Sequence, residues 1–176
     1  MFGKNSIVFT INSDRDHSVV NKLTGLFNEN IVIQEVMSDM LCLTVHKDVI
    51  HDVLLFLRDD PELQYNFLTT LCGMHYPEKE QLGVVYHLHS FANNHRIRIK
   101  TAAALSNPVI SSATDIWSSA NWMEREAYDF YGIRFDGHPN LKRILNVDDM
   151  TDFPMRKDFP LEDGTREDKE DGMFGR

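Results

Sequence analysis

The segment from Leu82 to Thr101 alternates apolar and polar residues on both sides of Asn93-Asn94, and this pattern constrains the fold more than any other. Alternation with a period of two is typical of strands that bury one face, and paired asparagines favour a tight turn. The sequence therefore predicts an antiparallel hairpin with a two-residue turn at Asn93-Asn94. On its mainly apolar side, the predicted cross-strand pairs are Tyr86 with Thr101, Leu88 with Ile99, and Ser90 with Ile97.

The other side of the predicted hairpin carries histidines and cations. Its expected pairs are His87 with Lys100, His89 with Arg98, and Phe91 with Arg96. His87 and His89 have the spacing of many metal sites, and His75 could add a third ligand, so one hypothesis is a stand-alone metal-dependent enzyme. The cations opposite these imidazoles disfavour a bound divalent ion. The alternatives for this basic strip are a partner-facing surface and an ordinary solvated face.

Hydrophobic periodicity predicts further elements on both sides of the hairpin. Helical spacing predicts helices over residues 19–27 and 49–57, and the second is stopped by Asp59-Asp60-Pro61. Strands are predicted over residues 31–36 and 41–45, and residues 67–76 form either a buried strand or a short helix running into one. Helices among several strands favour an α+β fold (an α/β sandwich), with one mixed β-sheet and helices packed on it. We expect a single α/β domain over residues 1–145 and an extended C-terminal segment over residues 146–176.

A dense run of acids, bases and aromatic residues extends from Asn121 to Leu145. Apolar residues at a spacing of three to four predict a helix over residues 121–131. Its core-facing residues are expected to be Trp122, Met123, Ala127, Phe130 and Tyr131. Its charged face is expected to consist of Glu124, Arg125, Glu126 and Asp129. Arg125 and Asp129 are four residues apart and are expected to pair. Gly132 is expected to end the helix in the left-handed conformation.

Composition narrows the classes of function. Acids outnumber bases by 27 to 18, for a formal net charge of −9, which argues against general nucleic-acid binding because phosphate contacts need clustered cations. No apolar run is long enough to span a bilayer, and the first ten residues lack the pattern of a signal peptide, so we expect a soluble cytoplasmic protein. Cys42 and Cys72 lie in apolar stretches and are expected to be buried free thiols, too few for an ordinary iron–sulfur cluster. The sequence contains no glycine-rich nucleotide loop.

Several fixed runs of residues resemble the C-type subunit of the NADH:quinone oxidoreductases, which is the thirty-kilodalton subunit of respiratory complex I. The runs are Glu124-Arg125-Glu126, residues 129–133, Gly137-His138-Pro139, residues 142–145 and residues 154–160. By this resemblance the signature or interface residues are Trp122, Glu124, Arg125, Glu126, Asp129, Gly132, His138, Pro139, Arg143, Arg156, Lys157 and Asp158. We expect the charged members of this set to pair in a semi-buried network or with a partner, because exposed ion pairs stabilise little. The chain departs from the family at residues 73–76, where an aspartate is common, and at Met150 and Asp152.

The resemblance implies a role in a large assembly. It places the chain in the peripheral arm of a proton-translocating enzyme, beside the forty-nine-kilodalton (D-type) subunit and the cluster-bearing subunits of the quinone-reducing module. The location implied is the cytoplasmic side of the membrane, without a membrane span. By the same resemblance this chain has no catalytic, cofactor-binding or metal site, and NADH, FMN, iron–sulfur clusters and quinone belong to other subunits. The alternative is the equivalent subunit of an energy-converting hydrogenase or a chloroplast-type dehydrogenase complex.

The last sixteen residues, 161–176, consist mainly of charged residues and glycine. Such a segment buries too little apolar surface to offset the entropy lost on ordering. We therefore expect it to become ordered only when it binds a partner.

Overall fold

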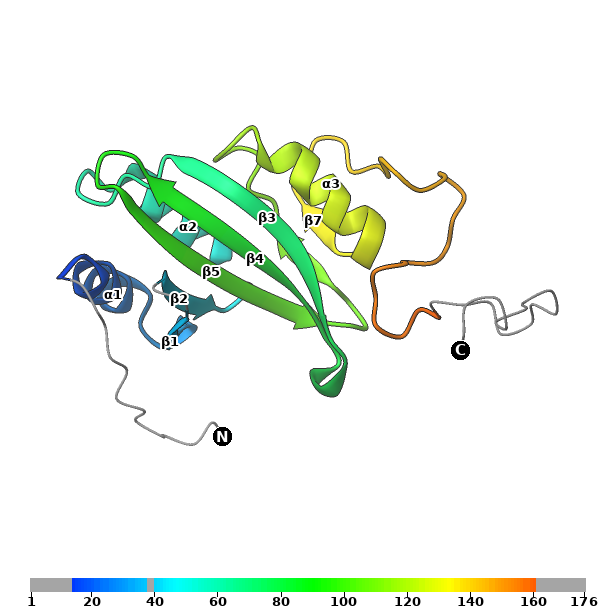
Figure 1. Ribbon diagram of the computed structural model, residues 1–176, viewed down its shortest axis with the longest axis horizontal. Helices are drawn as coiled ribbons and strands as arrows, with labels where there is room; N and C mark the ends of the chain where they lie inside the picture. Colours follow the sequence, from blue (N-terminus) through cyan, green and yellow to red (C-terminus); the bar gives the residue numbers. More distant parts are fainter. Residues whose placement is uncertain (1–13, 38–39, 161–176) are drawn as a thin grey trace, which may run out of the picture.

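Five strands form one mixed sheet in the order β1-β2-β5-β4-β3 (Figure 1). The strands are β1 (Ile31–Met37), β2 (Met40–Val45), β3 (Phe67–Tyr76), β4 (Gln81–Ser90) and β5 (His95–Ala104). Neighbouring strands are antiparallel except for β2 and β5, which run parallel. The structure is a computed structural model that describes residues 14–37 and 40–160. The strands predicted over residues 31–36, 41–45 and 67–76 are confirmed.

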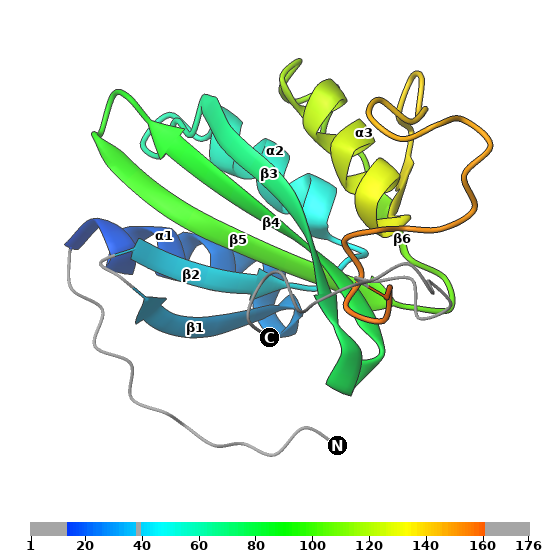
Figure 2. The ribbon, with the colours of Figure 1, turned by 45° about the vertical axis from the view of Figure 1, so that its right-hand side comes forward.

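Two amphipathic helices cover one face of this sheet. Helix α1 (Asp14–Phe27) and helix α2 (Ile50–Asp59) lie on the same side of the strands (Figure 2). Each turns its apolar stripe toward the sheet, where residues such as Leu23 and Leu54 are fully buried. The strands contribute the other half of the core, including Leu43, Tyr86 and Ile99. The predicted α+β fold, with helices on a mixed sheet, is confirmed.

The predicted hairpin exists, but its register differs from the expected one by two residues. The last cross-strand pair is Ser90 with His95, so the loop has four residues, 91–94, instead of two. The observed pairs include Leu88 with Ile97, Tyr86 with Ile99, His87 with Arg98 and His89 with Arg96. A shift of two residues leaves every side chain on its predicted face, because side chains alternate with a period of two. The predicted apolar and basic sides are therefore correct although the pairs are not.

Contacts made by the two asparagines explain the longer loop. The backbone N–H of Asn93 donates to Ser90 Oγ at 3.4 Å, and its side-chain Nδ2 donates to the carbonyl oxygens of Glu62 and Leu63 at 2.7 and 2.9 Å. Asn94 adopts the left-handed conformation, with φ of 47°. The loop is thus fixed by a segment thirty residues away in sequence, which local turn preferences do not reveal.

A third helix, α3 (Ala120–Tyr131), lies along the edge strand β3 (Figure 1). The backbone N–H of Leu71 contacts Met123 Sδ at 3.2 Å. The ring of Tyr131 crosses Gly73 so closely that a Cβ at this glycine would lie 2.5 Å from it. The short strands β6 (Val109–Ser111) and β7 (Arg134–Asp136) pair in parallel, and the 3-10 helices are η1 (Asn28–Asn30) and η2 (Pro77–Lys79). The helix predicted over residues 121–131 is confirmed.

The two cysteines have different surroundings. Cys42 is fully buried in β2, as predicted. Cys72 is exposed, so its predicted burial is wrong. Cys72 lies opposite Val85, on the face of the edge strand β3 that turns away from α1 and α2. Alternation therefore places the Cys72 side chain on the side where the described residues include no covering helix.

Residues 146–160 follow β7 and its loop without forming a helix or strand. The predicted partner-ordered tail, residues 161–176, lies outside the described residues. Within the described part of the chain, no helix combines the length and apolar character needed to cross a membrane.

Candidate functional site

The carboxylate of Asp129 is the centre of the signature region. It is fully buried, although the sequence places it on the charged face of α3. Arg143 Nη1 donates to Asp129 Oδ1 at 2.8 Å, and Asn146 Nδ2 donates to the same oxygen at 3.0 Å. Three successive backbone N–H groups, those of Ile144, Leu145 and Asn146, donate to Oδ2 at 3.1, 2.8 and 3.1 Å. The chain after α3 therefore wraps around this carboxylate at residues 143–146.

These donors determine the charge state of Asp129. Burial alone would raise the pKa of the carboxyl group, but the Leu145 N–H, the Arg143 guanidinium and the Asn146 donors outweigh it and hold the pKa well below its usual range. Asp129 is thus ionised at every pH near neutrality. Successive backbone N–H groups that converge on one anion form a nest, and here the anion is part of the same chain.

Arg143 and Arg156 hold the C-terminal segment against α3. Arg143 also donates to the backbone oxygen of Asp129 at 2.8 Å and to that of Asp152 at 3.2 Å. Arg156 Nε donates to the backbone oxygen of Tyr131, the last residue of α3, at 2.7 Å. Both guanidinium groups lie over the ring of Phe153, with their carbons 5.1 Å (Arg143) and 4.4 Å (Arg156) from its centre. Charge–carbonyl bonds and ring stacking thus fix residues 150–156 in place.

Arg125 does not pair with Asp129 as predicted. Its Nε and Nη2 atoms donate to the backbone oxygens of Lys142 and Arg143, both at 3.0 Å. Asp129 points into the core and is already saturated by the donors described above. Trp122 was expected in the core but is 62% exposed, with its ring 4.9 Å from the Arg125 guanidinium carbon. The helix is thus rotated so that Glu124 and Asp129 face inward and Trp122 faces outward.

Glu124 is the second fully buried carboxyl group of α3. Ser112 Oγ donates to its Oε2 and the backbone N–H of Ala113 to its Oε1, each at 2.7 Å. Burial raises the pKa of Glu124 to about 7, and the two hydrogen bonds offset this effect only in part. Glu124 therefore joins α3 to the turn that follows β6, and its partners are a hydroxyl and a backbone N–H group instead of another charged signature residue.

The predicted end of α3 at Gly132 is confirmed. Gly132 has φ of 75°, and its N–H donates to the Tyr128 oxygen at 2.8 Å. A Cβ at this position would lie 2.6 Å from the Phe153 ring and 2.7 Å from Arg156. Only glycine therefore accommodates both the backbone conformation and the clamp formed by Phe153 and Arg156.

Replacing Gly132 with Ala is expected to lower the free energy of unfolding by about 2 to 5 kcal/mol. Left-handed backbone costs an L-residue roughly 1 to 2 kcal/mol, and overpacking against Phe153 adds about 1 to 3 kcal/mol. Gly137→Ala is the matched control, because Gly137 has φ of 83° but open space around its Cβ position. Urea denaturation of both variants isolates the packing contribution. Equal losses in the two variants would contradict the close contact.

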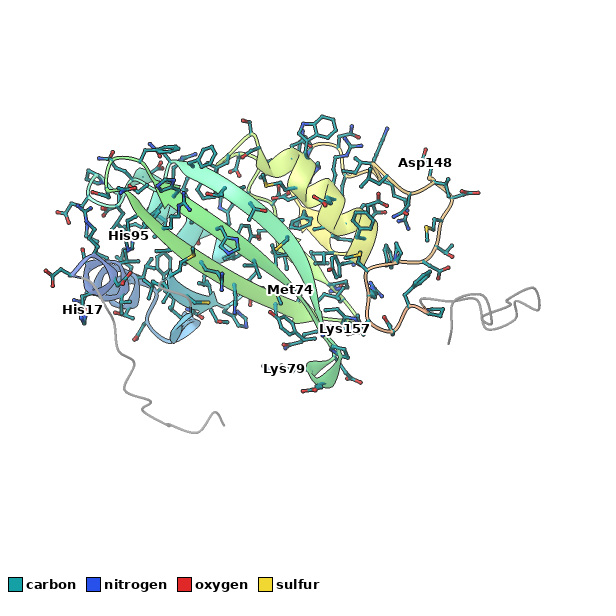
Figure 3. The ribbon with its side chains drawn as sticks, viewed as in Figure 1. His17, Met74, Lys79, His95, Asp148 and Lys157 are labelled. Carbon is teal, nitrogen blue, oxygen red and sulfur yellow. The ribbon has the colours of Figure 1, made fainter. Side chains whose placement is uncertain are left out.

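Two histidines attach loops to these elements. His138 Nε2 donates to the Asn121 oxygen at 3.1 Å, while its Nδ1 accepts the Asn140 N–H at 3.0 Å. His75, buried in β3, accepts the Lys157 N–H at Nδ1 at 3.0 Å. Figure 3 shows Lys157 beside the end of β3. Since this Nδ1 acts as an acceptor, the Asp158 carboxylate at 3.6 Å from the same nitrogen is not its ion-pair partner.

Comparisons with known proteins show which family the chain belongs to. The profile of the family described as respiratory-chain NADH dehydrogenase, 30 Kd subunit, matches residues 43–165. The chain is 51% identical over 122 residues to the C-type subunit of NADH-quinone oxidoreductase from Roseiflexus castenholzii, an alignment that covers 69% of this chain and 70% of that protein. The chain belongs to the thirty-kilodalton subunit family.

Solved structures show the same fold. The trypsin-resistant fragment (1–134) of Nqo5 matches with a TM-score of 0.59 and 25% identity, covering 72% of this chain and 99% of that one. A chain of the membrane-bound sulfane sulfur reductase, an archaeal respiratory membrane complex, matches with a TM-score of 0.69 over 84% of this chain and 87% of that one. The TM-score shows that the two chains share a fold. An identity of 21% carries no conclusion about activity.

The family signature predicted from sequence divides into two groups. A first group forms the network around α3 and consists of Glu124, Arg125, Asp129, Gly132, His138, Arg143 and Arg156. A second group stays outside it and consists of Trp122, Glu126, Pro139, Lys157 and Asp158, of which Lys157 contributes only its backbone N–H. Four residues of the network were missed, namely Ser112, Ala113, Asn146 and Phe153. Asn146 directly follows the signature run 142–145, and this adjacency is a signal that could have identified it.

The three histidines of the metal-enzyme hypothesis do not converge. His75 lies opposite Leu82 and shares its core-facing side, whereas His87 and His89 lie on the other face of the sheet. His75 Nδ1 and His87 Nε2 already accept hydrogen bonds from Lys157 and Arg98. No group of three or more His, Cys, Asp or Glu residues within 14–37 and 40–160 could hold a metal ion. His75, His87 and His89 therefore do not form one metal site.

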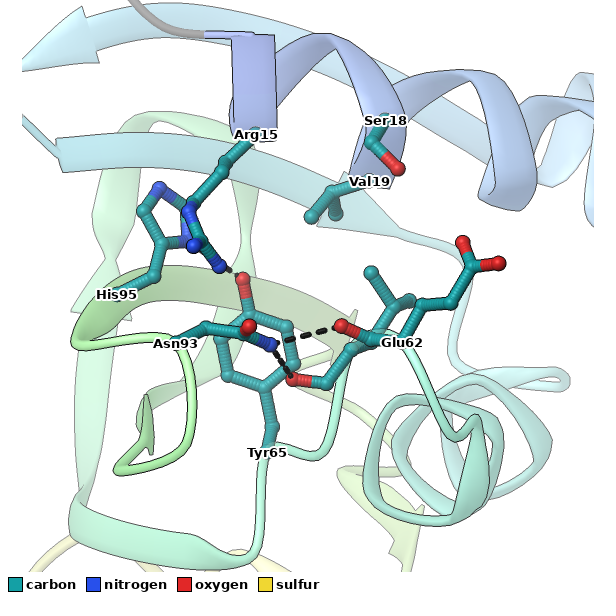
Figure 4. A pocket seen from close by; sticks show the side chains of 8 residues that line it. Arg15, Ser18, Val19, Glu62, Tyr65, Asn93 and His95 are labelled. Carbon is teal, nitrogen blue, oxygen red and sulfur yellow. Dashed lines mark hydrogen bonds between the residues drawn. The ribbon is translucent and has the colours of Figure 1, made fainter.

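A cavity of about 100 Å³ lies between α1 and the β4–β5 loop, lined by Arg15, Tyr65 and Asn93 among others (Figure 4). Tyr65 Oη is 2.6 Å from His95 Nδ1, and His95 Nε2 is 3.0 Å from Asp16 Oδ1. Burial, and then the charge of Asp16, raise the pKa of Tyr65 well above its usual range. This chain of contacts ties α1 to the hairpin.

Proposed function

We propose that this chain is a non-redox structural subunit of a proton-translocating NADH:quinone oxidoreductase, where it holds the quinone-reducing module together. The proposal rests on the observation that the charged signature side chains form hydrogen bonds with backbone groups of the same chain. Asp129 accepts backbone N–H groups, while Arg125, Arg143 and Arg156 donate to backbone carbonyl groups. The Asp129 carboxylate already accepts five hydrogen bonds from its own chain, which leaves no acceptor site for a substrate, and the three arginines bind the backbone that surrounds α3.

The proposal extends to cofactors, partners and location. The partners are other subunits of the peripheral arm, especially the forty-nine-kilodalton (D-type) subunit and the cluster-bearing subunits, at the cytoplasmic side of the membrane. NADH, FMN, iron–sulfur clusters and quinone are bound by those other subunits. Support comes from the identity with the C-type subunit of Roseiflexus castenholzii and from the presence of only two cysteines, one of them buried, where a cluster needs about four ligands.

The variant Arg125→Ala tests this function. It removes two charge-assisted hydrogen bonds to the loop that surrounds Asp129, at a cost of about 1 to 3 kcal/mol in stability. We expect the amount of assembled complex in membranes to fall several-fold, as such losses commonly change protein abundance. Quinone reductase activity should fall in the same proportion, so that activity per assembled complex stays unchanged. Native gel electrophoresis and NADH:quinone assays on the same membranes measure both quantities.

Arg134→Ala is the matched control for Arg125→Ala. Arg134 is an exposed arginine in β7 whose one described side-chain bond goes to the Asn107 side chain, so its loss should leave assembly near normal. If Arg125→Ala left assembly intact while it abolished turnover, the signature would be catalytic and the structural function would be wrong.

A further inference from the structure

The face of the sheet opposite α1 and α2 carries no helix within the described residues, and it is the face toward the viewer in Figure 1. Its side chains come from alternate positions of four strands, as the cross-strand register requires. We call it the open face. Its exposed or partly exposed residues include Cys72, Met74, His87, His89, Arg96, Arg98 and Lys100.

Negative charge is missing from the strands that build the open face. The chain contains 27 Asp and Glu residues, yet not one of them lies in β2, β3, β4 or β5. The same strands contribute Arg96, Arg98 and Lys100. Described acids that border these strands are Glu78 and Glu80 in the turn after β3, and Glu126 on α3. The open face is therefore a cationic area on a protein whose net charge is −9.

The cations of the open face have no carboxylate partner among the described residues. Lysines and arginines that do form ion pairs lie elsewhere, at Lys22, Lys47, Arg58 and Arg143. Arg98 instead donates to His87 Nε2 at 2.8 Å, which keeps this imidazole neutral at that nitrogen. Burial and the charges of Arg98 and Lys100 lower the pKa of His87. The positive charge of this face is thus available to an outside anion.

Aromatic residues adjoin the cations at the hairpin end of the open face. Phe67 is 44% exposed and Phe91 61% exposed, and their ring centres are 5.2 Å apart. His89 lies 4.6 Å from the Phe91 ring. Aromatic residues, Met and Arg are the types enriched in protein–protein interfaces, where Glu and Asp are depleted. This composition fits a protein partner better than a phosphate backbone, which needs a larger cluster of cations.

A hollow of about 240 Å³ lies at the opposite end of the open face. Two lysines line it, Lys79 from the turn and Lys100 from β5, together with the polar side chains of Thr44 and Gln81. Figure 3 shows Lys79 at the lower tip of the sheet, beyond Met74. Two ammonium groups beside hydroxyl and amide groups match the charge and hydrogen-bonding needs of a carboxylate.

We propose that the open face binds an acidic stretch of a partner protein, with one carboxylate of that stretch in the hollow between Lys79 and Lys100. The proposal rests on the function proposed above, because the partner is another subunit of the same complex. Complementary charge then directs the partner to the face, and the aromatic cluster of Phe67 and Phe91 supplies the apolar contact.

Zero-length cross-linking in the purified complex tests the proposal. A carbodiimide joins a lysine amine to a carboxylate only where the two groups are in contact. We expect Lys79 and Lys100 to be linked to Asp or Glu residues within one stretch of another subunit, as identified by mass spectrometry. Lys47, which pairs with Asp48 of its own chain, is the internal control and should give no link to that stretch.

Charge reversal provides a second measurement. Arg96→Glu/Lys100→Glu is expected to lower the amount of assembled complex about tenfold, since like charges across an interface repel. Lys47→Glu/Arg134→Glu changes the net charge equally at other surfaces and should have no such effect. Thermal unfolding of the isolated variants should match the wild type. Replacing the cross-linked partner carboxylate with Lys should restore assembly of the first variant.

Three results would overturn the proposal. The first is that an acylating reagent modifies Lys79 and Lys100 as fast in the complex as in the free chain, which would show that no partner covers them. The second is that Lys79 and Lys100 form cross-links only to residues 161–176 of this chain. The third is binding of the free chain to phosphatidylglycerol vesicles or RNA that Arg96→Glu/Lys100→Glu abolishes, without a protein cross-link. In each case, the function proposed above still holds if the chain copurifies with the complex. If the chain never copurifies with the complex, both the proposed function and the acidic partner of the open face are wrong.

Discussion

Replacing Asp129 with Asn is expected to lower the free energy of unfolding by about 3 to 5 kcal/mol, the usual loss when one member of a buried ion pair is removed. The carboxylate accepts five hydrogen bonds, from Arg143, three backbone N–H groups and the Asn146 side chain. An amide has only one acceptor oxygen, and its NH2 group would point at donors. Arg143, whose side chain is 6% exposed, would keep its charge without a counter-ion. Urea denaturation at pH 7 measures the loss.

Glu126→Gln is the matched control for Asp129→Asn, because Glu126 lies on the same helix with an exposed side chain. Its effect should stay within about 0.5 kcal/mol. A loss smaller than about 1 kcal/mol in Asp129→Asn would mean that the nest around the carboxylate is not the element that orders residues 143–146.

Stability is expected to fall as the pH rises from 5 to 8 because of Glu124, by on the order of 3 kcal/mol. Burial raises the pKa of Glu124 to about 7 in the folded chain, whereas the unfolded chain releases this proton near the ordinary value of 4.5. Between pH 4.5 and about pH 7, the Glu124 carboxyl group is protonated in the folded chain and ionised in the unfolded chain. Each rise of one pH unit in this range therefore removes about 1.4 kcal/mol of stability. Asp129 adds no slope in this window, because its pKa stays well below its usual range in the folded state.

The variant Glu124→Gln isolates this effect. Its side chain remains neutral at every pH, can accept the Ala113 N–H, and can donate to Ser112 Oγ in place of accepting from it. The change in stability between pH 5 and pH 8 should therefore be smaller by about 3 kcal/mol in the variant than in the wild type, as denaturation curves at both pH values would show. The same pH dependence in both proteins would show that the Glu124 carboxyl group is not protonated in the folded state.

Local patterns predicted the elements of this fold but not every contact between them. The period-two alternation of Leu82 to Thr101 fixes which side chains face the core, and the structure confirms these faces. It does not fix the register, because pairings two residues apart satisfy the same alternation. The observed register is the one in which the Asn93 side chain donates hydrogen bonds to the carbonyl groups of Glu62 and Leu63. These two residues are near the loop only in the folded chain.

The orientation of α3 could not be predicted for a related reason. Charged residues are rarely buried without partners, so the sequence favours Glu124 and Asp129 on the solvent side and Trp122 in the core. Their partners come from residues 112–113 and 143–146, which no helical period connects to them. The resemblance to the thirty-kilodalton subunits singled out Glu124 and Asp129, but it did not indicate that their carboxylates bind backbone N–H groups.

The single parallel pair in the sheet, β2 with β5, has a consequence for the order of folding. Strands β3, β4 and β5 are joined by short turns and can pair soon after they meet, and so can β1 and β2. Pairing β2 with β5 requires the whole intervening chain, including α2, to form a loop, and closing a longer loop costs more entropy. The sheet therefore consists of two units, β1-β2 and β3-β4-β5, each formed by contacts close in sequence. They are joined along one seam, the pairing of β2 with β5. Since Leu43 and Ile99 are buried beside each other on that seam, the hydrophobic core is complete only when the two units have met.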